Sequence, residues 1–352
     1  MLRTRDVEME VVIGRSNDWK RANVREIAKR AKVSTATVSR AINHIPSVDS
    51  QLAKRVWKAA QELSYYPNTQ ARALVSGHSR IFGLIVSGIT NPFFPEIVDA
   101  FEEVAVRHDY EILSSSLQHS SMESLVRRMI ERRVEGVAIL TFGLGHCLVE
   151  DFRCRKIPVV IVDQSPQISG VSTIRVDYQH GIRQAVQHLA ALRHVRIAFV
   201  TGPEHLRSAA DRTSAFQTCM SEIGLEVHGT FIIEGDHTAE GGMKAMAQLA
   251  ALPSPPTALL CSNDMTAIGA LRRAFELGLS VPKRLSVIGF DDIRLAQFTI
   301  PPLTTVQMSR ADLAALAFNQ LFQIANGESA PPNKNSLLTT NLVLRSSTTR
   351  VP

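Results

Sequence analysis

The chain has 352 residues, of which 45% are hydrophobic and 20% charged, a globular composition without any run of about 18 apolar residues that could span a bilayer. This length exceeds that of one ordinary domain with a single core. It suits a small domain joined to a larger one of roughly 270 residues. The net charge of +6 is uneven: residues 1–80 hold 15 Lys or Arg against 7 Asp or Glu, and the remainder holds 24 against 26. Such an excess at one end is typical of a segment that meets a polyanion, although a solvated basic tail would give the same counts.

The first 22 residues show no sustained periodicity and no apolar core of a secretory signal. We therefore expect a flexible extension over residues 1–22 and a cytoplasmic protein. The four cysteines form no CxxC pair and have no His at ligand spacing, so we expect reduced thiols, no metal and no cofactor. They are Cys147, Cys154, Cys219 and Cys261.

Three short helices follow. The segment VREIAKRA predicts a first helix with Asn23 as its N-cap, and TATVSRAIN predicts a second helix that Ser34 caps. The segment SQLAKRVWKAAQELSYY predicts a third helix that Pro67 ends. Because only three residues separate the first two helices, we predict a helix-turn-helix.

The second helix of this motif enters the major groove, with its N-terminal residues facing base edges. Thr35, Ala36 and Arg40 are the exposed positions there. Arg40 can donate two hydrogen bonds to a guanine, and Ala36 offers a methyl group; alternatively, Arg40 is a solvated surface arginine. The neighbouring polar residues are suited to phosphates: Ser34, Thr37, Ser39 and Asn43.

Beyond Arg80, short apolar runs alternate with helical stretches, which is typical of parallel sheets covered by helices. The change between two sets of such units near Val176 and Asp177 predicts two similar lobes with a cleft, and ligands in such sheets bind beyond the carboxyl ends of strands. The strand-like runs are IFGLIVS, EGVAILT, IPVVIVD, RIAFVTG, TALLCS and LSVIGFD. The helical stretches include FPEIVDAFEEVAVRH, LVRRMIERR, GIRQAVQHLAAL and AIGALRRAFELG.

The segments NVREIAKRAKVSTATVSRAIN and VWKAAQELSYYPN resemble the head of the lactose-repressor (LacI/GalR) family. SGITNPFF, VEGVAIL, NDMTAIGALRRAFELGLSVPKRLSVIGFDD and IPPLTTV resemble its effector domain in content and order. The resemblance implies a small all-α helix-turn-helix head over residues 23–68 and a hinge helix over 69–78. It also implies an α/β two-lobed periplasmic-binding-protein-like domain over 79–352, with two parallel doubly wound sheets and a cleft.

The function that the resemblance implies is sequence-specific regulation of transcription, with repression as the family's usual outcome. The implied partners are near-palindromic double-stranded operator DNA, a carbohydrate-related small-molecule effector held between the lobes, and a second copy of the chain. We expect a homodimer, since the C-terminal segment PPNKNSLLTTNLVLRSSTTRVP lacks the leucine heptad that would tie dimers into tetramers. No membrane partner is expected.

The segment NTQARALVSG resembles the family's hinge, which becomes helical on operator DNA and inserts a leucine into the minor groove. Leu74 occupies the leucine position, with Ala71 and Arg72 beside it. A helix of about two turns is unstable alone, so its ordering is coupled to binding; an ordinary linker is the alternative. Lys32 stands where the family usually has Gly or Asn, and Ser64 stands where it frequently has Gly, which predicts local strain or a shifted helix end.

The resemblance, carried over residue by residue, also implies which residues form the effector cleft. They include strand-end carboxylates and amides that can bind hydroxyls, and an arginine that can clamp an anionic or hydroxyl-rich ligand. Asn263 and Asp291 could instead cap the elements that follow them, and the two phenylalanines could belong to the core. His237 stands where the family often has Trp or Phe; imidazole stacks less well but can hydrogen-bond or change charge near neutral pH. This weakens the case for a hexose or purine and leaves a more polar or acidic ligand open. The predicted site is Asn91, Phe93, Phe94, Asp163, Ser208, Arg212, His237, Asn263 and Asp291.

Two other classes of protein are alternatives to a regulator. A transport binding protein would share the large domain, but the missing signal and the helix-turn-helix argue against it. An enzyme could use the polar cleft, but the sequence has no GxSxG, no phosphate-binding glycine loop and no metal-ligand spacing. We therefore expect no catalytic activity.

Overall fold

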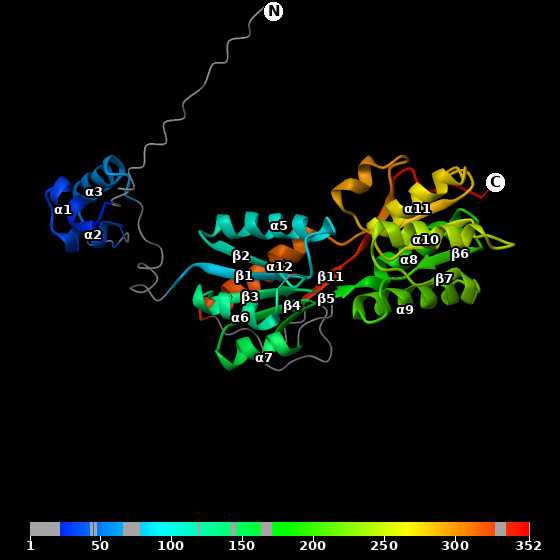
Figure 1. The fold of residues 1–352 in the computed structure, drawn as a ribbon, viewed down its shortest axis with the longest axis horizontal. Helices are drawn as coiled ribbons and strands as arrows, with labels where there is room; N and C mark the ends of the chain where they lie inside the picture. Colours follow the sequence, from blue (N-terminus) through cyan, green and yellow to red (C-terminus); the bar gives the residue numbers. More distant parts are fainter. Residues whose placement is uncertain are drawn as a thin grey trace, which may run out of the picture. The chain divides into compact units, whose positions relative to one another are not determined.

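The computed structural model describes residues 22–42, 45, 48–65, 78–118, 120–141, 146–162, 171–327 and 336–351. The chain divides into two compact units, with the sequence boundary between Ser79 and Arg80. Both units are drawn in Figure 1. Residues 1–21 and 66–77, which include most of the expected extension and hinge, lie outside the described residues. No helix in the described ranges is long and apolar enough to cross a membrane.

The smaller unit is a three-helix head whose core is formed by Ile27, Val38 and Val56, all fully buried. The predicted first N-cap is confirmed, because the Asn23 side chain accepts the Glu26 N–H and the Glu26 carboxylate accepts the Asn23 N–H. This reciprocal pair satisfies donors that the helix start leaves without partners. The helices are α1 (Val24–Ala31), α2 (Thr35–Ile42) and α3 (Ser50–Glu62).

Both positions at which the sequence departs from the family's usual residue have left-handed backbone, with φ of 54° at Lys32 and 47° at Ser64. The Arg55 guanidinium of α3 donates to the Ala31 carbonyl (2.6 Å). This hydrogen bond satisfies one of the carbonyls that have no partner within α1 at its C-terminal end. The third helix ends earlier than expected, at Glu62 and not at Pro67. The prediction was wrong because the chain turns at Ser64, where the Tyr65 N–H donates back to the Ala60 carbonyl.

The first lobe of the larger unit is a six-stranded sheet in the order β11-β5-β4-β3-β1-β2, with every neighbouring pair parallel. Phe82 and Leu84 of β1 face one apolar layer and Ile85 faces the other, so the strand is buried on both sides. Helices α5 and α12 pack together over one face, and α6 and α7 cover the other (Figure 1). The strands are β1 (Ile81–Val86), β2 (Glu111–Ser116), β3 (Gly136–Leu140), β4 (Val159–Val162), β5 (Ser172–Asp177) and β11 (Ser336–Thr339). The helices are α5 (Phe93–Arg107), α6 (Met122–Glu131), α7 (His146–Cys154) and α12 (Arg310–Ala325).

The second lobe repeats this plan, with strand order β12-β10-β9-β8-β6-β7. One edge departs from the expected parallel sheet, because β12 is antiparallel to β10. Its helices pack as two pairs, α8 with α9 and α10 with α11. The strands are β6 (Ile197–Val200), β7 (Ile232–Ile233), β8 (Ala258–Cys261), β9 (Ser286–Asp291), β10 (Thr304–Gln307) and β12 (Asn341–Val343). The helices are α8 (Tyr178–Ala191), α9 (Arg207–Glu222), α10 (Ala239–Ala250) and α11 (Asp264–Glu276), with short 3-10 turns η1 (Gly229–Phe231) and η2 (Arg294–Phe298).

The chain passes between the lobes three times: from β5 to α8, from β10 to α12, and from β11 to β12. The first passage is where the sequence predicts the change, since β5 ends at Asp177 and α8 starts at Tyr178. The buried Thr340 hydroxyl of the third passage donates to the Asp177 carbonyl (2.7 Å) and accepts the Gly181 N–H (3.1 Å). The first and third passages are therefore bonded to each other, which makes them one connection between the lobes.

Candidate effector pocket and DNA-reading surface

A pocket of about 480 Å³ lies between the lobes of the larger unit. The first lobe contributes residues that follow β1, β2 and β3, and the second contributes residues at the ends of β6, β8, β9 and β10, as expected for ligands beyond the carboxyl ends of parallel strands. Asp163 lies outside the described residues. The other eight predicted effector residues all line this pocket: Asn91, Phe93, Phe94, Ser208, Arg212, His237, Asn263 and Asp291.

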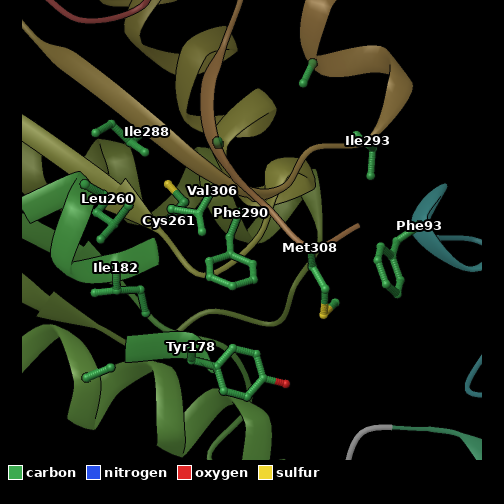
Figure 2. Close-up of a cluster of buried hydrophobic side chains, with 14 of the residues drawn as sticks. Phe93, Tyr178, Ile182, Leu260, Cys261, Ile288, Phe290, Ile293, Val306 and Met308 are labelled. Atoms are coloured by element: carbon green, nitrogen blue, oxygen red, sulfur yellow. The ribbon is translucent and has the colours of Figure 1, made fainter. Parts of the chain in front are cut away.

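The first lobe supplies an aromatic wall. Phe93 and Phe94 open α5 and meet edge to face, with ring centroids 5.5 Å apart. Asn91 shapes this start, because its side-chain oxygen accepts the Phe93 N–H (3.0 Å). Phe93 is 2% exposed and belongs to the apolar core, and in Figure 2 its ring lies beside Met308 of the passage between the lobes. Phe93 therefore serves the core as well as lining the pocket.

Arg212 is a buried cation, 5% exposed, on α9. Its guanidinium carbon lies 4.2 Å from the ring centroid of Phe290 and 4.9 Å from that of Tyr178, contacts that stabilise a desolvated cation. Its Nη1 donates to the Ser262 carbonyl, and its Nη2 lies 3.9 Å from the Asp291 carboxylate. Nε has no hydrogen-bond partner among the described residues, which leaves a donor for a ligand.

Asp291 ends β9 and is 4% exposed. Burial raises the pKa of its carboxyl to about 7, against the opposing charges of Arg212 and Arg310. Beneath it, the fully buried Asp264 carboxylate accepts the Thr305 hydroxyl (2.6 Å) and the Ile293 N–H (2.8 Å), and burial raises the pKa of this group well above its usual range. Burial thus opposes the ionisation of Asp291, which lines the pocket, and of Asp264 behind the lining residues.

His237 has left-handed backbone (φ 62°), and its ring lies directly over Gly202. A methyl group on Gly202 would come within 1.9 Å of the His237 Nε2. Burial, and then the charge of Arg212, lowers the pKa of His237 to about 3. The expectation that this residue changes charge near neutral pH is therefore wrong, because both effects disfavour the imidazolium.

Asn263 is occupied by structural hydrogen bonds. Its side-chain oxygen accepts the Thr266 N–H (2.9 Å) and so caps α11, while its side-chain nitrogen donates to the His237 carbonyl (3.0 Å). The capping alternative describes this geometry, since both ends of the amide are used within the protein. Asn263 lines the pocket mainly as the support of His237.

Several lining residues were missed by the sequence analysis. Gln118 and Thr141 directly follow strands of the first lobe, and Met308 follows β10 of the second. The strand-end rule would have selected all three; β2 and β10 were not among the predicted runs, whereas the run EGVAILT already ended on Thr141. Also missed were Ser87, Gly88, Thr90, Pro203, Leu206, Asp236, Thr238, Ala239, Glu240 and Met265.

On the smaller unit, the start of α2 presents a polar surface. Thr35, Ala36, Ser39 and Arg40 are exposed. The Arg40 carbonyl accepts the Ile45 N–H (3.0 Å), and no hydrogen bond or ion pair joins the Arg40 side chain to another described residue. The Ser34 hydroxyl is used as a cap, since it accepts the Thr37 N–H (3.0 Å) and lies 2.9 Å from the Thr37 hydroxyl. This confirms the predicted cap of the second helix. Three candidate DNA contacts lie outside the described residues: Asn43, Arg72 and Leu74.

Comparison with known proteins assigns both units. Residues 23–68 match the family model for bacterial regulatory proteins of the lacI family, and residues 186–348 match a periplasmic binding protein-like domain. The transcriptional repressor CytR of Escherichia coli K12 is 34% identical over 94% of this chain and 97% of that repressor. Catabolite control protein A of Priestia megaterium is 33% identical over 86% of this chain and 92% of its own.

Solved structures agree with this assignment. The lac repressor dimer bound to operator and the anti-inducer ONPF superposes with a TM-score of 0.83 at 29% identity, covering 94% of this chain and all of that one. The complex of the regulator CelR with cellobiose gives 0.70 at 26% identity, covering 93% of this chain and all of that one. The named relatives are transcriptional repressors and regulators, not enzymes. The chain belongs to the lacI family of bacterial regulatory proteins.

Proposed function

We propose that this DNA-binding regulator represses transcription from a near-palindromic operator, and that a small molecule between its lobes sets its operator affinity. The observation that carries the proposal is the convergence of eight predicted effector residues on one interlobe pocket, in a chain whose other unit exposes a helix-turn-helix surface. The lac repressor structure with operator and anti-inducer provides the precedent for both ligands in one molecule. The regulator would act in the cytoplasm, on the nucleoid.

The pocket favours an uncharged, hydroxyl-rich effector over an acidic one. Arg212 is its one formally basic lining residue in the described chain, and the carboxylate of Asp291 already faces it. Asp236 and Glu240 add negative charge, while His237 is neutral. An anionic ligand would therefore enter a site of like charge.

A pair of hydroxyl groups would match two polar groups of the site, the buried Nε of Arg212 and the carboxyl of Asp291. One hydroxyl can accept from the Arg212 Nε, which lacks a partner among the described residues, and another can donate to the Asp291 carboxylate. Phe93, Phe94 and Met308 provide an apolar surface for the ring of such a ligand. We propose a carbohydrate-related effector with one apolar face.

Control of DNA binding follows from where the pocket lies. A ligand that touches both lobes favours the lobe arrangement in which it makes more contacts, and it can shift operator affinity only by that difference. We propose that residues 23–68 read the operator, that residues 69–78 form a hinge helix with Leu74 as a minor-groove wedge, and that residues 79–352 bind effector and dimerise. Binding to two half-sites requires a two-fold dimer.

Large apolar side chains on the second lobe support dimerisation. Phe275, Phe298 and Ile300 are 77%, 66% and 95% exposed, which is costly for a chain that stays alone in water. The lac repressor in the superposed structure is itself a dimer. Analytical ultracentrifugation of the full chain and of an Ile300→Asp variant would test the oligomeric state. We expect the variant to associate more weakly.

Two measurements test the proposed function. Genomic fragments that bind the purified full chain are sequenced, and a shared palindrome is expected; none at low as well as physiological salt would contradict it. Thermal unfolding is then followed with matched pairs of sugars and the corresponding sugar acids. Stabilisation by neutral members is expected, and stabilisation by acids alone would refute the charge argument.

A further inference from the structure

We infer that Glu96 and Arg310 form a clamp on the first lobe that grips the turn Asp291–Arg294 of the second lobe and so couples lobe closure to the position of Asp291. The inference rests on the proposed function, because it assigns a regulatory role to residues next to the same pocket. Neither residue lines that pocket. They are positioning residues, acting through the turn they hold.

The two side chains are paired on the first lobe. Glu96 lies in the first turn of α5, and Arg310 is the first residue of α12, which packs against α5. The Arg310 Nε lies 3.0 Å from the Glu96 Oε2, and the side chains are 20% and 23% exposed. Partial burial shields the pair from solvent, so it is better defined than a fully exposed ion pair.

Both partners also reach across to the second lobe. The Arg294 N–H donates to the two carboxylate oxygens of Glu96 (2.9 and 3.2 Å), and the Arg310 Nη1 donates to the Asp291 carbonyl (2.9 Å). One charged group thus binds a donor at the end of the turn, and the other binds an acceptor at its start. Hydrogen bonds to ionised groups are among the stronger ones in proteins.

The gripped turn has an unfavourable backbone. Asp291 and Asp292 have φ of 106° and 57°, conformations that persist in non-glycine residues only where the surroundings fix them. The second lobe fixes the middle of the turn, since the Asp292 carboxylate accepts from Arg345 (2.6 Å) and Gln307 (2.8 Å). The first lobe fixes both ends through the clamp.

This arrangement links two states. When the lobes separate, the Asp291 carbonyl and the Arg294 N–H lose their charged partners, and the carboxylate of Asp291 loses a support of its geometry beside Arg212. Conversely, a ligand that holds Asp291 in place favours the turn that the clamp recognises. The clamp and the effector therefore stabilise the same lobe arrangement.

The test measures an interlobe distance in the full chain by electron–electron double resonance, without effector or DNA. Labels are placed on the exposed native Cys154 of the first lobe and on an introduced cysteine at the exposed Ser254 of the second. Cys147 is replaced by serine, and excess unlabelled chain removes distances between subunits. Cys219 and Cys261 are buried.

We expect Glu96→Ala and Arg310→Gln each to raise the ratio of longer to shorter distances about tenfold, the size expected for a lost hydrogen bond to a charged group. The double variant loses both interlobe hydrogen bonds, so it should raise the ratio further than either single variant, but by less than the product of the two effects because the two side chains also bind each other. Asp99→Asn is the control, since it removes an exposed negative charge one turn along α5. Arg294→Ala should also leave the distances unchanged, because the clamp uses its backbone.

Unchanged distances in both clamp variants, with melting curves that show them folded, would overturn the inference. If either variant fails to fold, Glu96→Gln and Arg310→Lys replace it, with a smaller shift in the same direction expected. The readout needs neither operator nor effector, so failure of the clamp is distinguishable from failure of the proposed function, which the sequenced DNA fragments report.

Discussion

Replacing Gly202 by alanine tests whether the His237 ring is held against the pocket wall. The added methyl carbon would lie 1.9 Å from the ring Nε2 and 2.3 Å from Cε1, distances that no real contact permits. The His237 backbone is anchored by Asn263 (3.0 Å), so the ring has to swing away while its backbone stays. Overpacking of a filled site costs about 1–3 kcal/mol, and we expect a loss of unfolding free energy in this range.

The swing has a second consequence that separates it from general damage. Burial is the largest cause of the low pKa of His237, so a ring pushed towards the pocket should recover a pKa closer to that of an ordinary histidine. Urea unfolding and NMR titration of the His237 ring measure the two effects. His237→Ala in the Gly202→Ala background should restore most of the lost stability, because it removes the clashing ring. A Gly202→Ala protein with parental stability and an unmoved His237 pKa would refute the placement of the ring.

Three further predictions concern the DNA-reading surface and the pocket. Arg40→Ala should weaken operator binding by about 1–3 kcal/mol and relax base preference at one position, whereas Arg25→Ala on α1 should leave that preference intact; gel shifts with single-base operator variants decide this. Leu74→Ala should reduce DNA bending in a circular-permutation assay. Bending equal to that of the parental protein would contradict the proposal that Leu74 inserts into the minor groove. The pKa of Asp291 is raised to about 7 in the folded protein, so its contribution to stability is complete below the pKa of the unfolded carboxyl and is lost as the pH rises towards 7. Asp291→Asn should flatten that part of the curve of unfolding free energy against pH, and an unaltered curve would contradict the assignment.

The positions of six strands along the sequence were predictable because these strands are buried on both faces of their sheets. The apolar runs that became β1, β3, β4, β6, β8 and β9 are where continuous hydrophobic segments demand two covering layers. The strand β2, with the sequence EILSSS, was missed because it is a sheet edge and only half-buried. Polar residues are permitted at such an edge, so the hydrophobic signal is absent.

Which residues meet in the pocket was also predictable, but their roles were not. The resemblance to the family predicted that Phe93, Arg212 and Asp291 share one cleft, and all three line the pocket; the alternation of strands and helices predicts only that the cleft lies beyond the carboxyl ends of the strands. The state of each group depends on contacts from distant parts of the chain. Burial and the charge of Arg212 lower the pKa of His237, so this residue does not titrate near neutral pH. Both the oxygen and the nitrogen of the Asn263 amide are hydrogen-bonded within the protein.

The clamp shows why coupling between lobes is harder to read from sequence than the site itself. Its two interlobe bonds end on the carbonyl of Asp291 and the N–H of Arg294, which any residue in the turn would supply. What selects them is the left-handed path of the turn, and the sequence DDIR, which contains no glycine, does not predict that path. Asp264 and Asp292 enforce it from within the second lobe, by binding the Ile293 N–H and Arg345. A substitution at either aspartate should therefore loosen the lobes without touching the clamp, because it removes the backbone shape that Glu96 and Arg310 recognise.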